Sequence, residues 1–276
     1  MGQREYEGII FDVDGVLRRG GKPIPGAAET VNKIRGMGIR TVFLSNLSTK
    51  SREEYVNTLR GLGVEVSPDD LVLATSATAE YVAKNSRTRK VYLVGHAGLR
   101  RELEKAGLEI VDDPEEAEFL VAGSPFDEKG YVTEENRWKF TGAIRAILLA
   151  KAKFVAVNPD KLFPGADGKP IPGTGTFLGA ITAATGVEPV IIGKPSRVIY
   201  QIALEKLGVP PERAIMVGDQ VYTDIAPAKD LGMTTVLVLT GLTSREDLDR
   251  MDPSLKSKID FVLESVSGVL ELVSGG

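Results

Sequence analysis

The segment Asp12-Val13-Asp14-Gly15 places two carboxylates two positions apart, directly after the apolar run 8–11. In an extended chain this spacing points both side chains to one side, where they repel each other unless a cation or a proton intervenes. A hard divalent cation is the simplest remedy, and Gly15 would let the chain turn and bring backbone amides toward an anion. For the pair taken alone, a simple Asp-to-Gly turn is an equally good interpretation.

A second acidic cluster, 218–224, repeats this arrangement after the apolar run 214–217. If the two runs are neighbouring parallel strands, Asp219 comes within reach of Asp12 and Asp14 and completes an oxygen-only site suited to Mg2+. Asp224 would then bind the metal or orient its ligands. The alternative for Asp224 is an ordinary acidic residue in the first turn of a helix, where the helix dipole favours it.

Three further polar residues follow apolar runs in the same way. Ser45 and Asn46 come after 41–44, and Lys194 comes after 190–192. A hydroxyl, an amide and an ammonium are groups that can hold phosphoryl oxygens and neutralise their charge. Singly, each has a plain alternative, since Ser45 and Asn46 could cap a helix and most lysines are solvated. Together with the aspartates they indicate a phosphate-handling site.

The elements that must position these residues are predicted from hydrophobic periodicity. Short apolar runs alternate with helix-period segments, which is typical of a parallel sheet covered by helices. The predicted strands of the two outer parts are 8–11, 41–44, 190–192, 214–217 and 235–239. The predicted helices there are 27–37, 198–207 and 225–231. Ligands of open α/β sheets bind beyond the carboxyl ends of the strands, so four strand ends are expected to meet at one site.

The middle of the chain has enough predicted elements for a separate domain. Its predicted strands are 91–94, 119–122 and 154–157, and its predicted helices are 99–106 and 134–149. We therefore predict an α/β fold in which residues 1–80 and 189–276 form one Rossmann-like core domain. Residues 81–188 are predicted to form an α/β domain inserted into it.

Composition excludes several functional classes. The 276 residues contain 34 Lys plus Arg against 38 Asp plus Glu, a net charge of -4, which predicts neither a nucleic-acid partner nor binding to an anionic membrane. The absence of cysteine rules out disulfides, thiolate metal sites and a cysteine nucleophile. The start MGQREYEGII lacks the pattern of a signal peptide, and no apolar run reaches ~18 residues. A cytoplasmic location is the expectation.

The polar clusters resemble the four motifs of the haloacid dehalogenase superfamily. The matching motifs are Asp12-Val13-Asp14-Gly15-Val16, Ser45, Lys194 and Gly218-Asp219 through Asp224. The long stretch between the second and third motifs resembles the insertion of the superfamily's large, C2-type cap. Resemblance to the NagD and 4-nitrophenylphosphatase branch rests on Ser45-Asn46 with Ser48-Thr49-Lys50, Asn158-Pro159-Asp160, Pro172-Gly173-Thr174-Gly175 and Gly193-Lys194-Pro195-Ser196. The sequence departs from many relatives at Leu47, which bears on substrate preference.

The resemblance implies a role for each motif residue. Asp12 would be the nucleophile that forms an aspartyl phosphate, with its other oxygen on Mg2+. Asp14 would protonate the leaving alkoxide and then deprotonate the hydrolytic water, while its backbone carbonyl binds the metal. The phosphoryl oxygens would be held by Ser45, Asn46 and Lys194. The remaining metal ligands would be Asp219, directly, and Asp224, directly or through water.

The predicted function is therefore a magnesium-dependent phosphomonoesterase acting on small phosphorylated metabolites, with the cap excluding water and selecting the leaving group. A phosphomutase on the same scaffold stays open, as does a signalling or binding protein that accepts phosphate on an aspartate. Asp14 argues against the latter, because a general acid/base beside the nucleophile shortens the life of the aspartyl phosphate. The sequence does not distinguish among sugar phosphates, nucleoside monophosphates, phosphoglycolate and pyridoxal phosphate as substrates. The resemblance also implies a homodimer formed through the cap.

Overall fold

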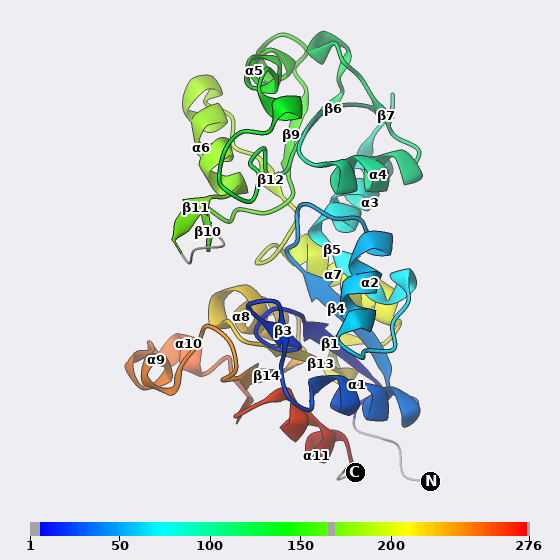
Figure 1. Cartoon of the computed structure of the whole chain (residues 1–276), viewed down its shortest axis with the longest axis vertical. Coiled ribbons are helices and arrows are strands. Elements are labelled where there is room, and N and C mark those ends of the chain that lie inside the picture. The colour runs from blue at the N-terminus through cyan, green and yellow to red at the C-terminus, as the bar shows by residue number, and fades with distance from the viewer. Residues whose placement is uncertain (1–5, 165–168, 275–276) are drawn as a thin grey trace. The chain divides into compact units, whose positions relative to one another are not determined.

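The computed structural model describes residues 6–164 and 169–274. They group into two compact units, and most of their helices and strands are labelled in Figure 1. The first unit comprises the described residues of Met1–Ser45, Tyr55–Val72 and Lys194–Gly276, and the second those of Asn46–Glu54 and Leu73–Gly193. This division differs from the predicted domains in three stretches, since 46–54, 73–80 and 189–193 group with the second unit. The predicted boundaries of independently folding domains stay a prediction.

The first unit is built on a six-stranded sheet in the order β15-β14-β13-β1-β4-β5. The strands are β1 (Gly8–Asp12), β4 (Arg40–Ser45), β5 (Leu71–Leu73), β13 (Ala214–Gly218), β14 (Thr234–Val238) and β15 (Phe261–Leu263). Every residue of β1 and β13 is buried, as expected for central strands covered by helices on both faces. The pairs β1–β4, β1–β13, β13–β14 and β14–β15 are all parallel, which confirms the predicted Rossmann-like class.

Strand register brings three of the predicted polar clusters to one edge of this sheet. Asp12 lies opposite Leu44 of β4, and Phe11 lies opposite Val217 of β13. Ser45 and Asp219 therefore follow directly on the two sides of the end of β1. The predicted strands 8–11, 41–44, 214–217 and 235–239 are confirmed to within a residue at each end.

The helices of the first unit surround this sheet (Figure 1). They are α1 (Ala27–Gly36), α2 (Arg52–Gly61), whose first residues group with the second unit, α7 (Arg197–Leu207), α8 (Ala226–Lys229), α9 (Arg245–Arg250), α10 (Pro253–Lys256) and α11 (Val269–Ser274). Helix α7 packs against β1 and β4, and α8 packs against β14. The predicted helix 225–231 is instead a π-helical turn, Val221–Ile225, followed by the short α8.

One predicted strand joins a different sheet. The run 190–192 does form a strand, β12 (Val190–Ile191), but it pairs with β9 (Lys153–Ala156) in the sheet of the second unit. The prediction that Lys194 ends a strand of the same sheet as Asp12 is therefore wrong. A two-residue strand carries little side-chain pattern, and its pairing partner is decided by non-local packing. Lys194 instead lies in the segment that leads into α7, which begins after Ser196.

The second unit has a five-stranded, fully parallel sheet in the order β12-β9-β8-β6-β7. Its remaining strands are β6 (Lys90–Val94), β7 (Glu109–Ile110) and β8 (Phe119–Ala122), with an antiparallel pair β10 (Leu162–Pro164) and β11 (Pro170–Pro172). Its helices are α3 (Ala74–Asn85), α4 (Ala97–Lys105), α5 (Lys139–Leu148) and α6 (Thr174–Thr185). The predicted helix 134–149 is divided, since a 3-10 turn, Glu134–Asn136, precedes α5.

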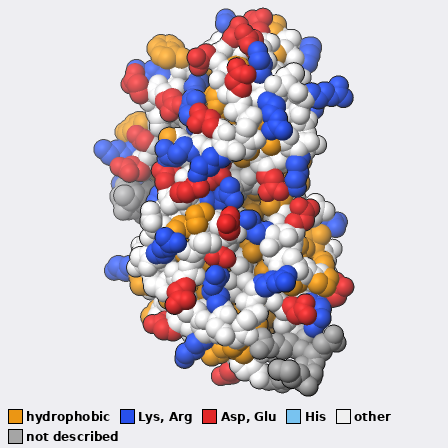
Figure 2. Space-filling model, turned by 90° about the vertical axis from the view of Figure 1, so that its right-hand side faces the viewer, with side chains coloured by type: hydrophobic (Ala, Val, Ile, Leu, Met, Phe, Trp, Pro, Cys, Tyr) orange, Lys and Arg blue, Asp and Glu red, His pale blue; other side chains and the backbone are white. Residues whose placement is uncertain are grey.

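The surface carries both charge signs. On the face drawn in Figure 2, acidic and basic side chains are interspersed, in keeping with the near-balance of 34 basic and 38 acidic residues in the whole chain. Within 6–164 and 169–274, none of the helices combines the length and the apolar content that crossing a bilayer requires.

Candidate active site

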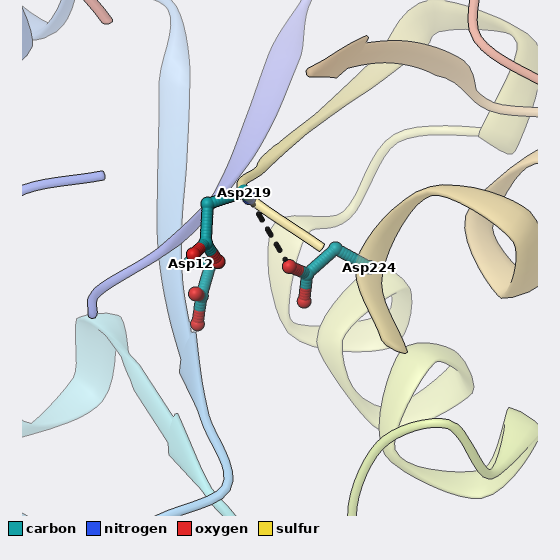
Figure 3. Close-up of side chains that lie close together, drawn as sticks. All are labelled: Asp12, Asp219 and Asp224. Atoms are coloured by element: carbon teal, nitrogen blue, oxygen red, sulfur yellow. Dashed lines mark hydrogen bonds between the residues drawn. The ribbon is translucent and has the colours of Figure 1, made fainter. Parts of the chain in front are cut away.

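Three carboxylates meet beyond the carboxyl ends of β1 and β13. Asp12 is the last residue of β1, Asp219 directly follows β13, and Asp224 lies in the π-helical turn. One carboxylate oxygen of each lies within 4.8 Å of the others, and all three residues are buried. Figure 3 shows the carboxylates of Asp12 and Asp219 next to each other, with Asp224 to one side and linked to the backbone of Asp219.

Lys194 is the cation of this cluster. Its Nζ lies 2.7 Å from Oδ1 of Asp12 and 2.7 Å from Oδ1 of Asp224. All three side chains are at most 5% exposed. One ammonium beside three carboxylates leaves the cluster with an excess of negative charge when every group is ionised, in a place where water screens little.

Burial and mutual repulsion shift the proton affinities of the cluster. Burial raises the pKa of Asp12 well above its usual range, Lys194 pulls it down, and Asp224 and Asp219 push it up again. Burial and the nearby Asp224 raise the pKa of Asp219 to about 6. For Lys194, burial alone would lower the pKa, but the charges of Asp12 and Asp224 raise it well above its usual value. The ammonium therefore stays charged, while the carboxylates lack sufficient positive charge.

Backbone amides hold the second acidic motif in place. The amides of Asp219 and Gln220 donate to Oδ2 of Asp224 at 3.2 and 3.0 Å, because the π-helical turn folds Asp224 back over the end of β13. The amide of Leu242, from the loop after β14, donates to Oδ2 of Asp219 at 2.7 Å. Oδ1 of Asp219 is buried and has no hydrogen-bond donor among the described residues.

Two glycines allow backbone to approach the cluster closely. Gly15 has φ of +86°, a conformation that favours glycine, and a Cβ built there would overlap the carboxylate of Asp219. A Cβ at Gly241 would overlap the same carboxylate from another side. The turn at Gly15 is predicted from the sequence, whereas nothing in the sequence marks Gly241, whose importance depends on the loop after β14 reaching Asp219.

The residues present fit a hard divalent cation. The donor set is made of carboxylate oxygens, which Mg2+ prefers. The cluster has excess negative charge, and Oδ1 of Asp219 is a buried acceptor that no described group satisfies. Burying an unsatisfied carboxylate oxygen is costly, and a bound cation removes that cost. Asp12, Asp219 and Asp224 are the side chains that would hold it.

Asp14 is separated from the cluster by its environment. Its side chain is 59% exposed and is not one of the three grouped carboxylates. Arg18 donates to it through Nε, 2.8 Å from Oδ1, and through Nη2, 3.4 Å from Oδ2. The guanidinium of Arg18 also lies over the ring of Tyr55, 5.4 Å from its centroid. The interpretation from spacing alone, in which both carboxylates of the first motif face one cation, does not describe the side chain of Asp14.

Ser45 and Asn46 have different surroundings although they are adjacent. Ser45 is the buried last residue of β4, and its side chain lies beside the hydroxyl of Tyr55, whose pKa is raised, chiefly by burial. Asn46 groups with the second unit. There its carbonyl accepts from Nδ2 of Asn158 at 2.7 Å, and its own Nδ2 donates to Asp160 at 3.4 Å.

Several residues that support the site are not among those predicted from the sequence. Arg18 and Tyr55 contact Asp14 and Ser45, and Tyr200 of α7 donates its hydroxyl proton to the carbonyl of Thr223, next to Asp224. A signal existed only for Arg18, which lies four positions after Asp14 in the same short loop. Tyr55 and Tyr200 have the sequence pattern of buried helix residues. The residues around them in the sequence do not indicate which polar group each hydroxyl approaches.

Comparisons with known proteins place the chain among phosphatases. Two family models, described as haloacid dehalogenase-like hydrolase and HAD-hydrolase-like, match residues 9–109 and 191–269. The sugar-phosphatase AraL of Bacillus subtilis is 34% identical over 98% of this chain and 94% of its own length. An acid sugar phosphatase of Staphylococcus epidermidis is 34% identical over 89% of this chain and 91% of its own.

Solved structures give the same result. A p-nitrophenyl phosphatase from Archaeoglobus fulgidus superposes with a TM-score of 0.87 at 42% identity, covering 97% of this chain and 99% of that one. NagD from Escherichia coli K-12 superposes with a TM-score of 0.82 at 30% identity, covering 95% and 97%. The chain therefore belongs to the haloacid dehalogenase-like hydrolase family and is a phosphatase of its NagD and 4-nitrophenylphosphatase branch.

Proposed function

We propose that this phosphatase is a magnesium-dependent phosphomonoesterase that works through a phosphate ester on Asp12. The observation that carries the proposal is the buried acidic cluster, in which Lys194 contacts Asp12 and Asp224 while Oδ1 of Asp219 lacks a partner. The arrangement supports a carboxylate nucleophile beside a divalent cation, and Mg2+ would supply charge neutralisation for the phosphoryl oxygens.

In the first step an oxygen of Asp12 attacks phosphorus, the bond from phosphorus to the ester oxygen breaks, and the leaving alkoxide takes a proton from Asp14. In the second step Asp14 takes a proton from water, whose oxygen attacks phosphorus and releases inorganic phosphate and free Asp12. Ser45, Asn46 and Lys194 would hold the phosphoryl oxygens. Splitting the reaction in this way lets one carboxyl act first as acid and then as base.

The proposed substrates are small phosphorylated metabolites, with sugar phosphates first among them. Support comes from the sugar phosphatases to which the chain is similar over nearly its whole length. The structures named for p-nitrophenyl phosphatases support 4-nitrophenyl phosphate as a laboratory substrate. A cytoplasmic location and a homodimer through residues 81–188 stay predictions.

The test measures phosphate release from glucose 6-phosphate and 4-nitrophenyl phosphate with and without Mg2+. Wild type should need the metal, and Asp12→Asn should lose at least about 1,000-fold in kcat because it removes the nucleophile. The matched control is Asp249→Asn, which removes an exposed carboxylate of α9 and should keep full activity. Acid-quenched wild type should carry phosphate on Asp12 during turnover, and Asp12→Asn should carry none.

The same assay separates the alternatives. A phosphomutase would return an isomeric sugar phosphate with little free phosphate. A phosphate-accepting signalling protein would hold the phosphoenzyme for many minutes. Full activity of Asp12→Asn would refute the mechanism whatever the substrate.

A further inference from the structure

The loop that follows the nucleophile closes on itself so that Arg18 faces Asp14. The amide of Gly15 donates to the carbonyl of Arg18 at 2.7 Å, and the amide of Arg18 donates to the carbonyl of Val13 at 3.2 Å. Arg18 also begins β2 (Arg18–Arg19), which pairs with β3 (Lys22–Pro23) in a small hairpin. The backbone of Arg18 is therefore tied to both sides of Asp14.

The guanidinium of Arg18 is oriented by two partners at once. Its Nε and Nη2 point to the two oxygens of Asp14, at 2.8 and 3.4 Å, which is the fork-to-carboxylate geometry that lysine cannot reproduce. Its planar face lies over the ring of Tyr55, 5.4 Å from the centroid. Although Asp14 is 59% exposed, Arg18 is only 19% exposed, so the partner of this surface carboxylate is itself packed.

Tyr55 gives this arrangement a rigid base. It is 1% exposed, lies in α2, and has its hydroxyl beside Ser45 at the end of β4. Asp14, Arg18 and Tyr55 thus form a continuous row of contacts within the first unit. An exposed carboxylate normally samples several rotamers, and a bidentate pair to a stacked arginine restricts them.

We propose that Arg18, stacked on Tyr55, is a positioning residue that aims the carboxyl of Asp14 at the leaving-group oxygen, a role that rests on the proposed function of Asp14 as general acid and base. Misplacing a catalytic group by even 1 Å lowers the rate strongly. Arg18 is expected to matter in proportion to how much the leaving group needs a proton. It touches Asp14 rather than the reacting atoms, which distinguishes it from a phosphate-binding arginine.

The test compares two substrates with different leaving groups. Nitrophenolate is a stable anion that departs without a proton, whereas a sugar alkoxide is a strong base that needs one. The ratio kcat/KM reports the steps up to cleavage of the ester bond. Arg18→Gln should lower kcat/KM about 30-fold for glucose 6-phosphate and less than about threefold for 4-nitrophenyl phosphate, within the range that general acid catalysis contributes.

Two further variants control for charge and folding. Arg18→Lys keeps the charge but loses the fork and the planar face, so it should recover only part of the loss on glucose 6-phosphate. Arg19→Gln removes the neighbouring arginine, which donates to the carbonyl of Thr240 at 3.3 Å, and should leave both substrates unchanged. Tyr55→Leu removes the stacking surface and should give the same selective loss in smaller measure.

A double variant separates this role from the proposed function. Asp14→Asn alone should show the leaving-group-dependent loss, and Arg18→Gln added to it should cost nothing more, because the two residues act as one unit. Additive losses, equal losses on both substrates, or a change confined to KM would overturn the positioning role while leaving the phosphatase mechanism intact. If Asp14→Asn itself shows no leaving-group dependence, the proposed role of Asp14 fails first.

Discussion

Asp12 ends strand β1 and Asp14 lies only two positions later, yet their surroundings are opposite. Asp12 is 4% exposed and shares Lys194 with Asp224 in a cluster where negative charge is in excess. Asp14 is exposed and lies in the turn after β1, where its carboxylate pairs with Arg18 of the β2–β3 hairpin. Burial raises the pKa of Asp12. Around Asp12, buried carboxylates repel one another without full compensation. Around Asp14, the ion pair with Arg18 only orients a side chain.

The comparison shows how one short motif can supply two chemical roles. A carboxylate in a buried, crowded cluster binds a cation strongly, because the cation removes an unfavourable charge arrangement. A solvated carboxylate can exchange protons with water and with a leaving group. Position in the fold, rather than residue type, therefore distinguishes the two aspartates.

The largest expected effect follows from removing the cation of the buried region. Lys194→Met keeps most of the side-chain volume but leaves Asp12 and Asp224 without their shared partner. Breaking a buried ion pair from one side typically costs about 3–5 kcal/mol, and urea unfolding in the absence of metal should show this loss in the free energy of unfolding. Lowering the pH should relieve part of it, because the buried carboxylates then take up protons.

A matched control lies at the surface. Lys229 pairs with Asp260 at 2.6 Å, with side chains 34% and 29% exposed, and Lys229→Met should cost only about 1 kcal/mol. If Lys194→Met and Lys229→Met lower the free energy of unfolding equally, the repulsion among the buried carboxylates is weaker than we infer.

The second prediction concerns pH. The pKa of Asp219 is about 6 in the folded protein, against roughly 3.9 for an unfolded chain, so between these values the folded state binds more protons. The protonated Asp219 side chain contributes its full stabilisation below about pH 4, and this contribution is lost as pH rises through about 6. Without metal, the free energy of unfolding should fall by up to about 3 kcal/mol over this range. Mg2+ should abolish this loss, because the cation favours the ionised form.

The measured quantity is the difference in free energy of unfolding between wild type and a variant that lacks the Asp219 carboxylate. Carboxyls with lowered pKa, such as Glu118 at about 2, stabilise the protein as pH rises and act in the opposite direction. The free energy of unfolding should therefore be followed from pH 4 to 7 in wild type and in Asp219→Asn. In EDTA, the free energy of unfolding of wild type should fall relative to that of Asp219→Asn as the pH rises. A constant gap would contradict the assignment.

The sequence predicts the frame of the site well, because local pattern and parallel topology determine it. The apolar runs before Asp12, Ser45 and Asp219 become neighbouring strands β1, β4 and β13, and their polar ends meet as expected. Lys194 reaches the same site although its preceding strand joins the other sheet. The proximity of Lys194 to Asp12 was therefore predicted for a wrong reason, since the two residues of β12 carry no information about their partner strand.

The supporting contacts could not be predicted in the same way. Tyr55 in α2 and Gly241 in the loop after β14 reach the site only through tertiary packing, and each has an unremarkable local sequence. The raised pKa of Asp12 likewise depends on burial, which spacing cannot supply. Residues far apart in sequence therefore decide how the motif residues are charged and aimed.

The third prediction tests how closely the backbone must approach the buried region. A Cβ at Gly241 would overlap the carboxylate of Asp219, so Gly241→Ala should displace that ligand and weaken Mg2+ binding about 10- to 100-fold. Gly36→Ala is the control, because a Cβ there meets nothing within 4 Å. Calorimetric titration with Mg2+ measures both. Unchanged affinity in Gly241→Ala would mean that Asp219 does not bind the metal.

The smallest expected effect belongs to the surface region. Arg18→Gln breaks the pair with Asp14, but because Asp14 stays solvated, the free energy of unfolding should fall by less than about 1 kcal/mol. Salt should shrink that difference further, whereas the loss in Lys194→Met should persist at high ionic strength because the buried pair is poorly screened. Urea unfolding at low and high salt distinguishes the two. A loss of several kcal/mol in Arg18→Gln would show that this hairpin supports the fold as well as orienting Asp14. The two aspartates would then differ in burial but not in what their ion pairs contribute to stability.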